Sequence, residues 1–304
     1  MMMHTFGGPG VLTVEQVPTP SFGPDEILIR VLAASVNPID YKIRRGSYRR
    51  SVMRPPLILG RDVSGVVDAV GRNVKHLQRG DEVFAMLGAH SGGYAELAVA
   101  KSEEVALKPR VLDHVHAAAV PLASITAWQA LFDHGGLGAG QRVLIHGAGG
   151  GVGHFAVQFA KSREATVFAT GDRADLNLLR ELGADEVIDY EYESFETKAQ
   201  AMDLVIDLVG GATQIRSWDV LREGGTLVST LEEPSVIQAA TRRAHGRFFM
   251  AEPKAEQLAE IARLIDAQKV MVIVSKTLPL DEAGRAHDEL EHEHSRGKFV
   301  LTVE

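Results

Sequence analysis

Cysteine is absent from the 304 residues of this chain. Without thiolates the chain cannot form disulfides, hold zinc or an iron–sulfur cluster through cysteine, or use a thiol nucleophile. The absence also fits a reducing compartment, and we expect a cytoplasmic protein. The chain also lacks any apolar run near the roughly 20 residues that span a bilayer. Its first residues, MMMHTFGGPG, contain no basic segment followed by an apolar one, so we expect no signal peptide.

An excess of basic residues is lacking too. The chain has 32 Lys and Arg against 40 Asp and Glu, a net charge of −8, which argues against nucleic acid as its main partner. The hydrophobic fraction of 45% and the charged fraction of 24% are ordinary for a soluble globular protein. A length of 304 residues favours two domains.

Short apolar segments separated by Gly and Pro fill the N-terminal third and predict a small barrel-like, β-rich domain. The expected strands are Ile27–Ala33, Val63–Val70, Asp81–Leu87 and Ala95–Val99. Ala117–Phe132 is apolar nearly all round, and we expect a buried helix there.

From Arg142 onward, strand-like and helix-like segments alternate, which indicates a parallel, doubly wound α/β sheet. Arg142–His146 predicts the first strand and Gly153–Ser162 the helix that follows it. The other elements expected in this part are the strands Thr166–Thr170, Glu186–Ile188, Asp203–Val209 and Gly225–Thr230 and the helix Asp175–Leu182.

The C-terminal segment has a different pattern, and we expect it to rejoin the sheet of the first domain. A helix over Glu252–Lys269 would place four apolar residues on one face: Leu258, Ile261, Ala262 and Ile265. The other elements expected are strands at Val270–Val274 and Lys298–Val303 and an acidic helix at Asp281–Ser295.

A glycine-rich turn carries the strongest functional signal. It lies between an apolar strand and an apolar helix, and its residues are Ala148, Gly149, Gly150, Gly151, Val152 and Gly153. This is an A-x-G-x-x-G variant of the dinucleotide fingerprint, in which glycine lets the backbone approach a pyrophosphate at a helix N-terminus. A glycine-rich turn packed only for steric reasons is the alternative.

The end of the second strand bears on the choice between NADH and NADPH. An acidic residue there would bind the ribose 2′-hydroxyl, whereas an arginine would suit a 2′-phosphate. If the strand ends at Thr170, no acid meets the ribose and Arg173 can reach a phosphate; if it runs longer, Asp172 takes the ribose. Alternatively, Asp172 and Arg173 could both be exposed loop residues that do not contact the cofactor. We expect NADPH rather than NADH, and we also expect Thr126 and Tyr190 to contact the cofactor.

Nearly the whole chain resembles the zinc-free quinone oxidoreductase and enone (alkenal) reductase group of the medium-chain dehydrogenase/reductase superfamily. The matching stretches are FGGPGVL (6–12), SVNPIDYKIRRG (35–46), LGRDVSGVV (59–67), GDEVFAM (80–86), GGYAELA (92–98), AAAVPLASITAWQAL (117–131), VLIHGAGGGVGHFAVQFAK (143–161), LGADEVIDY (182–190), REGGTLVS (222–229) and RGKFVL (296–301).

The resemblance implies a GroES-like, β-rich catalytic domain from both chain ends and a Rossmann NAD(P)-binding domain. We expect the catalytic domain over residues 1–116 and 252–304 and the nucleotide domain over 117–251. Two departures stand out: the first strand is short, and Asp172-Arg173 replaces the small residues common in NADPH-using members.

The positions that resemble zinc ligands of zinc-dependent members hold Asn37, Arg61-Asp62 and Leu122. An amide, a cation and an aliphatic group cannot make a catalytic zinc site, so we expect no zinc. Three histidines at 287, 292 and 294 suggest a metal, but they lie on the expected acidic helix, and a solvated face is the simpler interpretation.

Without zinc, another group must polarise a substrate carbonyl, and the candidates lie in residues 35–48. Lys42 could stabilise a developing oxyanion, Asn37 could donate an amide N–H, and Tyr48 could supply a phenol or an aromatic wall. Each has a plainer alternative. Asn37 before Pro38 is also a helix N-cap, Lys42 could be surface charge beside two arginines expected in solvent, and Tyr48 could simply pack.

The sequence therefore favours a zinc-independent NAD(P)H-dependent oxidoreductase that transfers hydride to a quinone or to the C=C bond of an enone. The alternative is a non-catalytic NADPH-binding redox sensor or structural protein, and loss of the polar groups in 37–48 would have favoured it. We expect a small-molecule substrate, no nucleic acid or membrane partner, and a homodimer.

Overall fold

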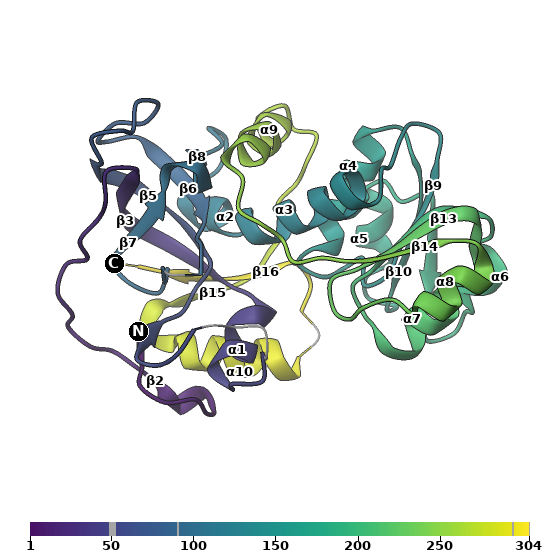
Figure 1. The fold of residues 1–304 in the computed structure, drawn as a ribbon, viewed down its shortest axis with the longest axis horizontal. Coiled ribbons are helices and arrows are strands. Elements are labelled where there is room, and N and C mark those ends of the chain that lie inside the picture. The colour runs from purple at the N-terminus through teal and green to yellow at the C-terminus, as the bar shows by residue number, and fades with distance from the viewer. Residues whose placement is uncertain (49–52, 90, 294, 304) are drawn as a thin grey trace. The chain divides into compact units, whose positions relative to one another are not determined.

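The computed structural model describes residues 1–48, 53–89, 91–293 and 295–303. The chain divides into two compact units, and each is described by itself (Figure 1). Unit 1 comprises residues 1–122, 253–267 and 272–304, and unit 2 comprises residues 123–252 and 268–271. The domain boundaries expected from the sequence stay a prediction. No helix among the described residues is long and apolar enough to cross a membrane.

A seven-stranded sheet forms the centre of unit 1, in the order β15-β16-β3-β5-β6-β8, with β7 also paired to β3. Its strands are β3 (Glu26–Val36), β5 (Asp62–Val70), β6 (Glu82–Met86), β7 (Leu97–Lys101), β8 (Val105–Leu107), β15 (Val274–Pro279) and β16 (Lys298–Thr302). The C-terminal strand β16 pairs antiparallel with β3, with Leu301 opposite Ala34. The expectation that the tail rejoins the first sheet is therefore confirmed.

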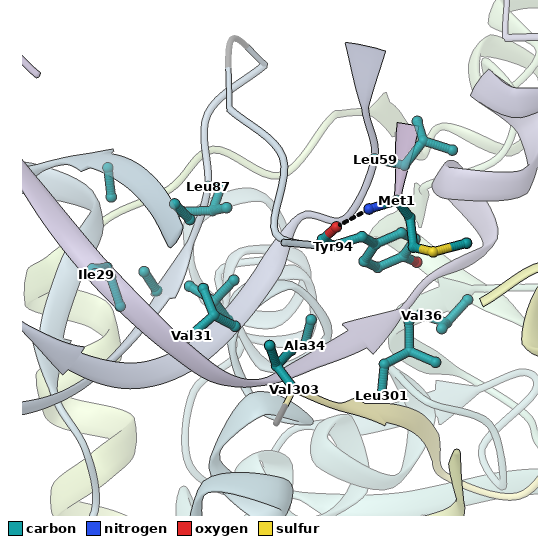
Figure 2. Packing of buried hydrophobic residues seen from close by; sticks show 14 of the residues in the cluster. Met1, Ile29, Val31, Ala34, Val36, Leu59, Leu87, Tyr94, Leu301 and Val303 are labelled. Atoms are coloured by element: carbon teal, nitrogen blue, oxygen red, sulfur yellow. Dashed lines mark hydrogen bonds between the residues drawn. The ribbon is translucent and has the colours of Figure 1, made fainter. Parts of the chain in front are cut away.

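Short elements complete unit 1 and enclose its apolar core. Three two-residue strands pair beside the N-terminus, namely β1 (Met2–Met3), β2 (Leu12–Thr13) and β4 (Leu57–Ile58). The helices are η1 (Pro9–Val11), α1 (Pro38–Arg44), η2 (Ser102–Glu104), α2 (His114–Ala118), α9 (Ala255–Asp266), η4 (Leu280–Glu282) and α10 (Ala283–His292). Figure 2 shows the core around Tyr94, whose carbonyl oxygen accepts a hydrogen bond from the Met1 amino group at 2.7 Å. The four apolar residues predicted on one face of α9 are all buried.

Unit 2 contains a six-stranded parallel sheet in the order β11-β10-β9-β12-β13-β14. Its strands are β9 (Arg142–Ile145), β10 (Thr166–Gly171), β11 (Glu186–Asp189), β12 (Met202–Asp207), β13 (Leu221–Ser229) and β14 (His245–Phe248). The helices that follow β9 are α4 (Gly153–Ser162), α5 (Leu176–Glu181), α6 (Phe195–Lys198), α7 (Gly211–Ser217) and α8 (Val236–Arg242). This order is the 3-2-1-4-5-6 order of a Rossmann sheet. The parallel, doubly wound sheet expected from the alternation of segments is confirmed, whereas strand β14 was not expected.

Two elements differ from expectation. The single helix expected over 117–132 is divided into α2, α3 (Pro121–Trp128) and the π-helix η3 (Gln129–His134). Pro121 has no N–H to continue the turn of α2, so a new helix begins there. The prediction of a strand at 270–274 is wrong. The Met271 N–H and C=O groups form hydrogen bonds of 2.6 and 3.0 Å with the side chain of Gln158, and strand pairing starts only at Val274.

Candidate active site

The glycine-rich turn of unit 2 joins the end of β9 to the start of α4. A Cβ added to Gly150 would meet only the Gly147 carbonyl oxygen, at 3.4 Å, so this backbone has open space beside it. The N–H groups of residues 151 to 153 make no hydrogen bond with any described residue, as expected for the first turn of a helix. The turn thus presents free donors and the positive end of the α4 dipole together.

Two other glycines in the turn are required by its own packing. A Cβ on Gly153 would lie 2.3 Å from the Gly147 carbonyl oxygen, and one on Gly149 would lie 2.4 Å from the Asp175 carboxyl group. A side chain at position 153 would clash with backbone, and one at position 149 would require the buried Asp175 side chain to move. The steric explanation therefore fits Gly149 and Gly153, whereas Gly150 leaves space beside the backbone, and contact of this turn with a pyrophosphate stays a prediction.

The turn is fixed to the second strand. The Ala148 N–H donates to the Thr170 carbonyl oxygen at 3.0 Å. The His146 ring bonds the hydroxyl groups of Thr170 at 3.2 Å and Ser217 at 3.0 Å, and burial lowers the pKa of His146 to about 4. His146 is therefore neutral, and Thr170, also buried, uses its hydroxyl inside the unit.

Strand β10 ends at Gly171, one residue later than Thr170, so Asp172 directly follows the strand. Its Oδ1 accepts the backbone N–H groups of Ala174 and Asp175 at 2.8 and 3.0 Å. Arg173 is exposed and makes no hydrogen bond or ion pair with the described residues. The Tyr190 N–H donates to the Gly171 carbonyl oxygen at 3.2 Å. The structure thus brings the turn, residues 170–173 and Tyr190 together.

Thr126 also belongs to unit 2. It lies within α3 and is buried. Its contact with the cofactor stays a prediction, as do the individual cofactor roles of the other residues named above.

In unit 1, three strand ends meet where α1 begins. β3 ends immediately before Asn37, while β5 begins at Asp62 and β16 begins at Lys298. Both strands run antiparallel to β3, with Ser35 opposite Asp62 in the register. The topology alone therefore places Asn37, Asp62 and Lys298 at one edge of the sheet.

Asn37 is the N-cap residue of α1, but its side chain does not serve the helix. Its backbone N–H donates to Asp40 Oδ2 at 2.8 Å, which is half of a capping box. Its Nδ2 donates to Asp62 Oδ2 at 2.9 Å, and its Oδ1 accepts a hydrogen bond from Lys298 Nζ. Asn37 is 4% exposed. Asn37 is therefore the N-cap residue of α1 and a member of a buried polar cluster, and its role in catalysis or substrate binding stays a prediction.

Asp62 is the centre of this polar cluster. Its fully buried carboxylate accepts hydrogen bonds from the Ser35 hydroxyl at 2.8 Å, from Asn37, and from the Leu122 N–H at 2.8 Å. Burial raises its pKa, whereas Lys298 and the three donors act in the opposite direction. Of the positions that resemble zinc ligands, Asn37, Leu122 and Asp62 of the pair Arg61-Asp62 are thus joined through one carboxylate.

The cations of α1 differ from expectation. Arg44 was expected in solvent, but it is 1% exposed and its guanidinium bonds Glu291 on α10 at 2.9 Å. Lys42 is half-buried, and burial lowers the pKa of its ammonium group. Within the described ranges, Lys42 Nζ makes no ion pair or hydrogen bond. The N–H groups of Ser47 and Tyr48 donate to the Lys42 carbonyl oxygen, and Tyr48 packs against the core of unit 1.

The expected solvated face of histidines is wrong for His287. It is fully buried, and its Nε2 lies 3.1 Å from the Tyr94 hydroxyl, because α10 packs against α1 and β3. His292 is exposed, and His294 lies outside the described residues. The described parts of the chain contain no group of three or more His, Cys, Asp or Glu residues that could hold a metal ion.

Lys298, Asp40, Tyr94 and His287 were not identified from the sequence as parts of a polar cluster. Lys298 was noted only within the matching stretch RGKFVL and as the start of a strand. A lysine that opens an apolar C-terminal strand was the available signal, since such a strand is expected to be buried.

Two family models match the chain, an alcohol dehydrogenase GroES-like domain over residues 23–110 and a zinc-binding dehydrogenase over residues 182–301. The mouse mitochondrial NAD(P)H oxidoreductase RTN4IP1 is 37% identical over 92% of this chain and 82% of its own length. The Arabidopsis thaliana chloroplastic NADPH-dependent alkenal/one oxidoreductase is 33% identical over 97% of this chain and 77% of its own length.

Among solved structures, the quinone oxidoreductase from Coxiella burnetii superposes with a TM-score of 0.92 at 36% identity, over 100% of this chain and 98% of that chain. With the GroES-like match and the Rossmann strand order, this confirms the predicted fold class.

Proposed function

Because this chain belongs to the quinone and enone oxidoreductase group of the medium-chain dehydrogenase/reductase superfamily, we propose that it is an NADPH-dependent reductase of a small conjugated carbonyl compound. The substrate is a quinone or an enone. NADPH, when bound, supplies the hydride. An enone takes it at the β-carbon and a proton from solvent at the α-carbon, while a quinone takes one hydride and one proton to become a hydroquinone.

The observation that carries this proposal is the turn between β9 and α4. Its open backbone at Gly150 and its free N–H groups fit a pyrophosphate, which needs close approach and several donors. A second support is that the polar groups expected of a reductase are present in unit 1. Asn37, Lys42 and Tyr48 all belong to or border α1.

Strand β10 runs one residue beyond Thr170, the case in which Asp172 is expected to take the ribose, but the hydrogen bonds of Asp172 and the exposure of Arg173 favour NADPH over NADH. Asp172 stands where an acid would bind the ribose 2′-hydroxyl, but its Oδ1 already accepts two backbone N–H groups. Arg173 has an exposed guanidinium without a partner among the described residues, which suits a 2′-phosphate. The Arabidopsis relative is named as NADPH-dependent, in agreement with this choice.

Zinc is not part of the proposed chemistry, because the donor set does not fit it. The side chains of Asn37 and Asp62 are hydrogen-bonded to each other, and the Leu122 side chain has no atom that could ligate a metal. The Lys298 ammonium donates a hydrogen bond to Asn37. A cation held at these ligands would repel a second one. We therefore assign polarisation of the substrate carbonyl to Lys42 or Asn37, with Tyr48 as a lining group. A cytoplasmic location and a homodimer are part of the proposal.

The decisive experiment follows NADPH oxidation by the purified protein with a panel of quinones, enones and 2-alkenals. Turnover of at least one class, retained after exhaustive chelation, is the expected result. A matched variant, Gly150→Val, should lose NADPH binding and turnover together. If wild-type protein binds NADPH but oxidises it with no compound of the panel, the non-catalytic NADPH-binding alternative is correct.

A further inference from the structure

Lys298 is a buried cation that the proposed chemistry does not yet use. Lys298 is the first residue of β16 and is 3% exposed. Its Nζ donates hydrogen bonds to the Val36 carbonyl oxygen at 3.1 Å and to Asn37 Oδ1. The same atom lies 3.9 Å from Asp62 Oδ2. Burying an ammonium group costs free energy unless the group is paired, so these three contacts stabilise Lys298 in its buried position.

The two charged neighbours determine how the Asn37 carboxamide is turned. Lysine can only donate hydrogen bonds and an ionised carboxylate can only accept them. The amide oxygen must therefore face Lys298 and the amide nitrogen must face Asp62, as the distances show. A flip of the amide would place N–H against N–H and oxygen against oxygen.

This arrangement leaves Asn37 with spare hydrogen-bonding capacity. The amide nitrogen has two hydrogens, and only one of them is used by Asp62; the described residues offer no acceptor for the other. A donor fixed in this way needs no reorganisation when charge develops on a substrate oxygen, which is the property that makes oxyanion donors effective.

The ammonium of Lys298 lies beside residues at positions that resemble the zinc ligands of zinc-dependent members. It contacts Asn37 and lies 3.9 Å from Asp62 of the pair Arg61-Asp62. A neutral side chain there would leave the Asp62 carboxylate buried with hydrogen bonds alone. It would also release the amide oxygen of Asn37.

We propose that Lys298 is a positioning residue of the reductase site, whose buried ammonium, paired with Asp62, holds the Asn37 carboxamide with one N–H available to the substrate carbonyl. This inference rests on the proposed function and adds to it. Lys298 does not touch the substrate; it acts through Asn37.

The test compares Lys298→Met with Lys108→Met in the full chain. Lys108 is a matched buried lysine of the same unit: its side chain is 5% exposed, and its ammonium bonds backbone carbonyls and lies 3.4 Å from Glu82, with no link to Asn37. Lys298→Met should lower kcat on the best quinone or enone by about tenfold or more, with NADPH Kd within about twofold of wild type. Lys108→Met should leave kcat within about twofold.

A double-mutant cycle distinguishes positioning from a general structural role. If Lys298 acts through Asn37, then Lys298→Met should add almost nothing to the loss already caused by Asn37→Ala. Independent, multiplicative losses would overturn the proposal. If Lys298→Met does not fold, Lys298→Arg carries the test: it keeps the charge but not the compact ammonium geometry, so kcat should still fall at least about fivefold while the melting temperature stays close to that of wild type.

The outcomes separate this inference from the function on which it rests. No turnover of any quinone or enone by wild-type protein would overturn both. If wild type and Lys298→Met both turn over normally, only the role of Lys298 is overturned. Where Lys298→Met does not fold, normal turnover by Lys298→Arg has the same meaning.

Discussion

The Tyr94 hydroxyl lies 3.1 Å from His287 Nε2, although 193 positions separate the two residues. The same hydroxyl donates to Asp40 Oδ2 at 3.1 Å, so His287 is the donor to the Tyr94 oxygen and carries its proton on Nε2. Burial and, secondly, the charge of Arg44 lower the pKa of His287 to about 3, whereas burial raises the pKa of Asp40 to about 6. This chain of bonds ties α1 to α10 and so joins the two ends of the polypeptide within unit 1.

We expect His287 to make the stability of the protein depend on pH. Its pKa is about 3 when folded and 6.5 when unfolded, so below pH 6.5 the unfolded state binds the proton first. Its contribution is complete above pH 6.5 and is lost as the pH falls toward 3. Between pH 6.5 and pH 5 the loss amounts to about 2 kcal/mol. Asp40 acts in the opposite direction between pH 6 and 3.8, because its folded pKa is raised.

Urea unfolding at pH 7 and pH 5 compares wild type with His287→Gln, which lacks the titrating ring. The free energy of unfolding of wild type should fall by about 2 kcal/mol relative to that of the variant between these pH values. His292→Gln, a change at an exposed histidine of the same helix, should behave like wild type. A constant difference between wild type and His287→Gln would show that His287 titrates normally.

The sequence predicted unit 2 more completely than the polar cluster of unit 1, for a physical reason. The helix Gly153–Ser162 was predicted with its exact bounds, because helix and strand periodicities and the glycine-rich turn are local features. The burial of Arg44 and His287 is not local. It depends on contact between α1 and α10, which are separated by most of the chain.

Lys298 and Asp62 could not be connected from sequence for the same reason. Their approach requires that β5 and β16 pair on opposite sides of β3 and in one register. The cofactor preference was harder to predict than the fold because it depended on one residue, the end of β10. Strand ends are the least certain part of any sequence-based assignment, and the strand ends at Gly171 rather than Thr170.

Gly150→Val should abolish NADPH binding while the protein stays folded. The added Cβ would meet only the Gly147 carbonyl oxygen, at 3.4 Å, but the side chain would hold a pyrophosphate away from the free N–H groups. Gly153→Val should instead destabilise unit 2, because its Cβ would lie 2.3 Å from that oxygen. Fluorescence titration with NADPH and thermal melts distinguish the two variants. Titration of Gly150→Val with wild-type affinity would exclude the turn as the binding site.

Arg173→Ala should weaken NADPH binding by about tenfold or more and leave NADH binding unchanged. A charged hydrogen bond between a guanidinium and a phosphate contributes about 1.5–3 kcal/mol, and only NADPH carries the 2′-phosphate. Isothermal titration with both cofactors measures the difference. Arg242→Ala provides the control, since that arginine of unit 2 is paired with Asp219 in the turn between α7 and β13. Equal losses for both cofactors would mean that Arg173 does not contact the phosphate.

Lys42→Met should lower turnover on enones by about a hundredfold or more, with little effect on NADPH affinity. An ammonium aimed at a developing oxyanion in a dry site stabilises it by about 2.7–4 kcal/mol, the range associated with the loss of one oxyanion donor. Methionine keeps most of the stem and removes the charge. Quinones should lose less, because their two-electron reduction is intrinsically easier. Steady-state kinetics on both substrate classes, with Lys75→Met as the exposed control, measures the effect.

The pH profile gives Lys42 a signature that surface charge would not produce. Burial lowers its pKa below that of an ordinary lysine, so the ammonium loses its proton at a lower pH than a solvent-exposed lysine would. Because the protonated form is the one that stabilises the oxyanion, kcat on enones should fall as the pH rises through that pKa, and this basic limb should be missing in Lys42→Met. If Lys42→Met keeps its turnover within threefold of wild type on every accepted enone, Lys42 has no catalytic role. Asn37, held by Lys298 and Asp62, would then be the group that polarises the substrate carbonyl.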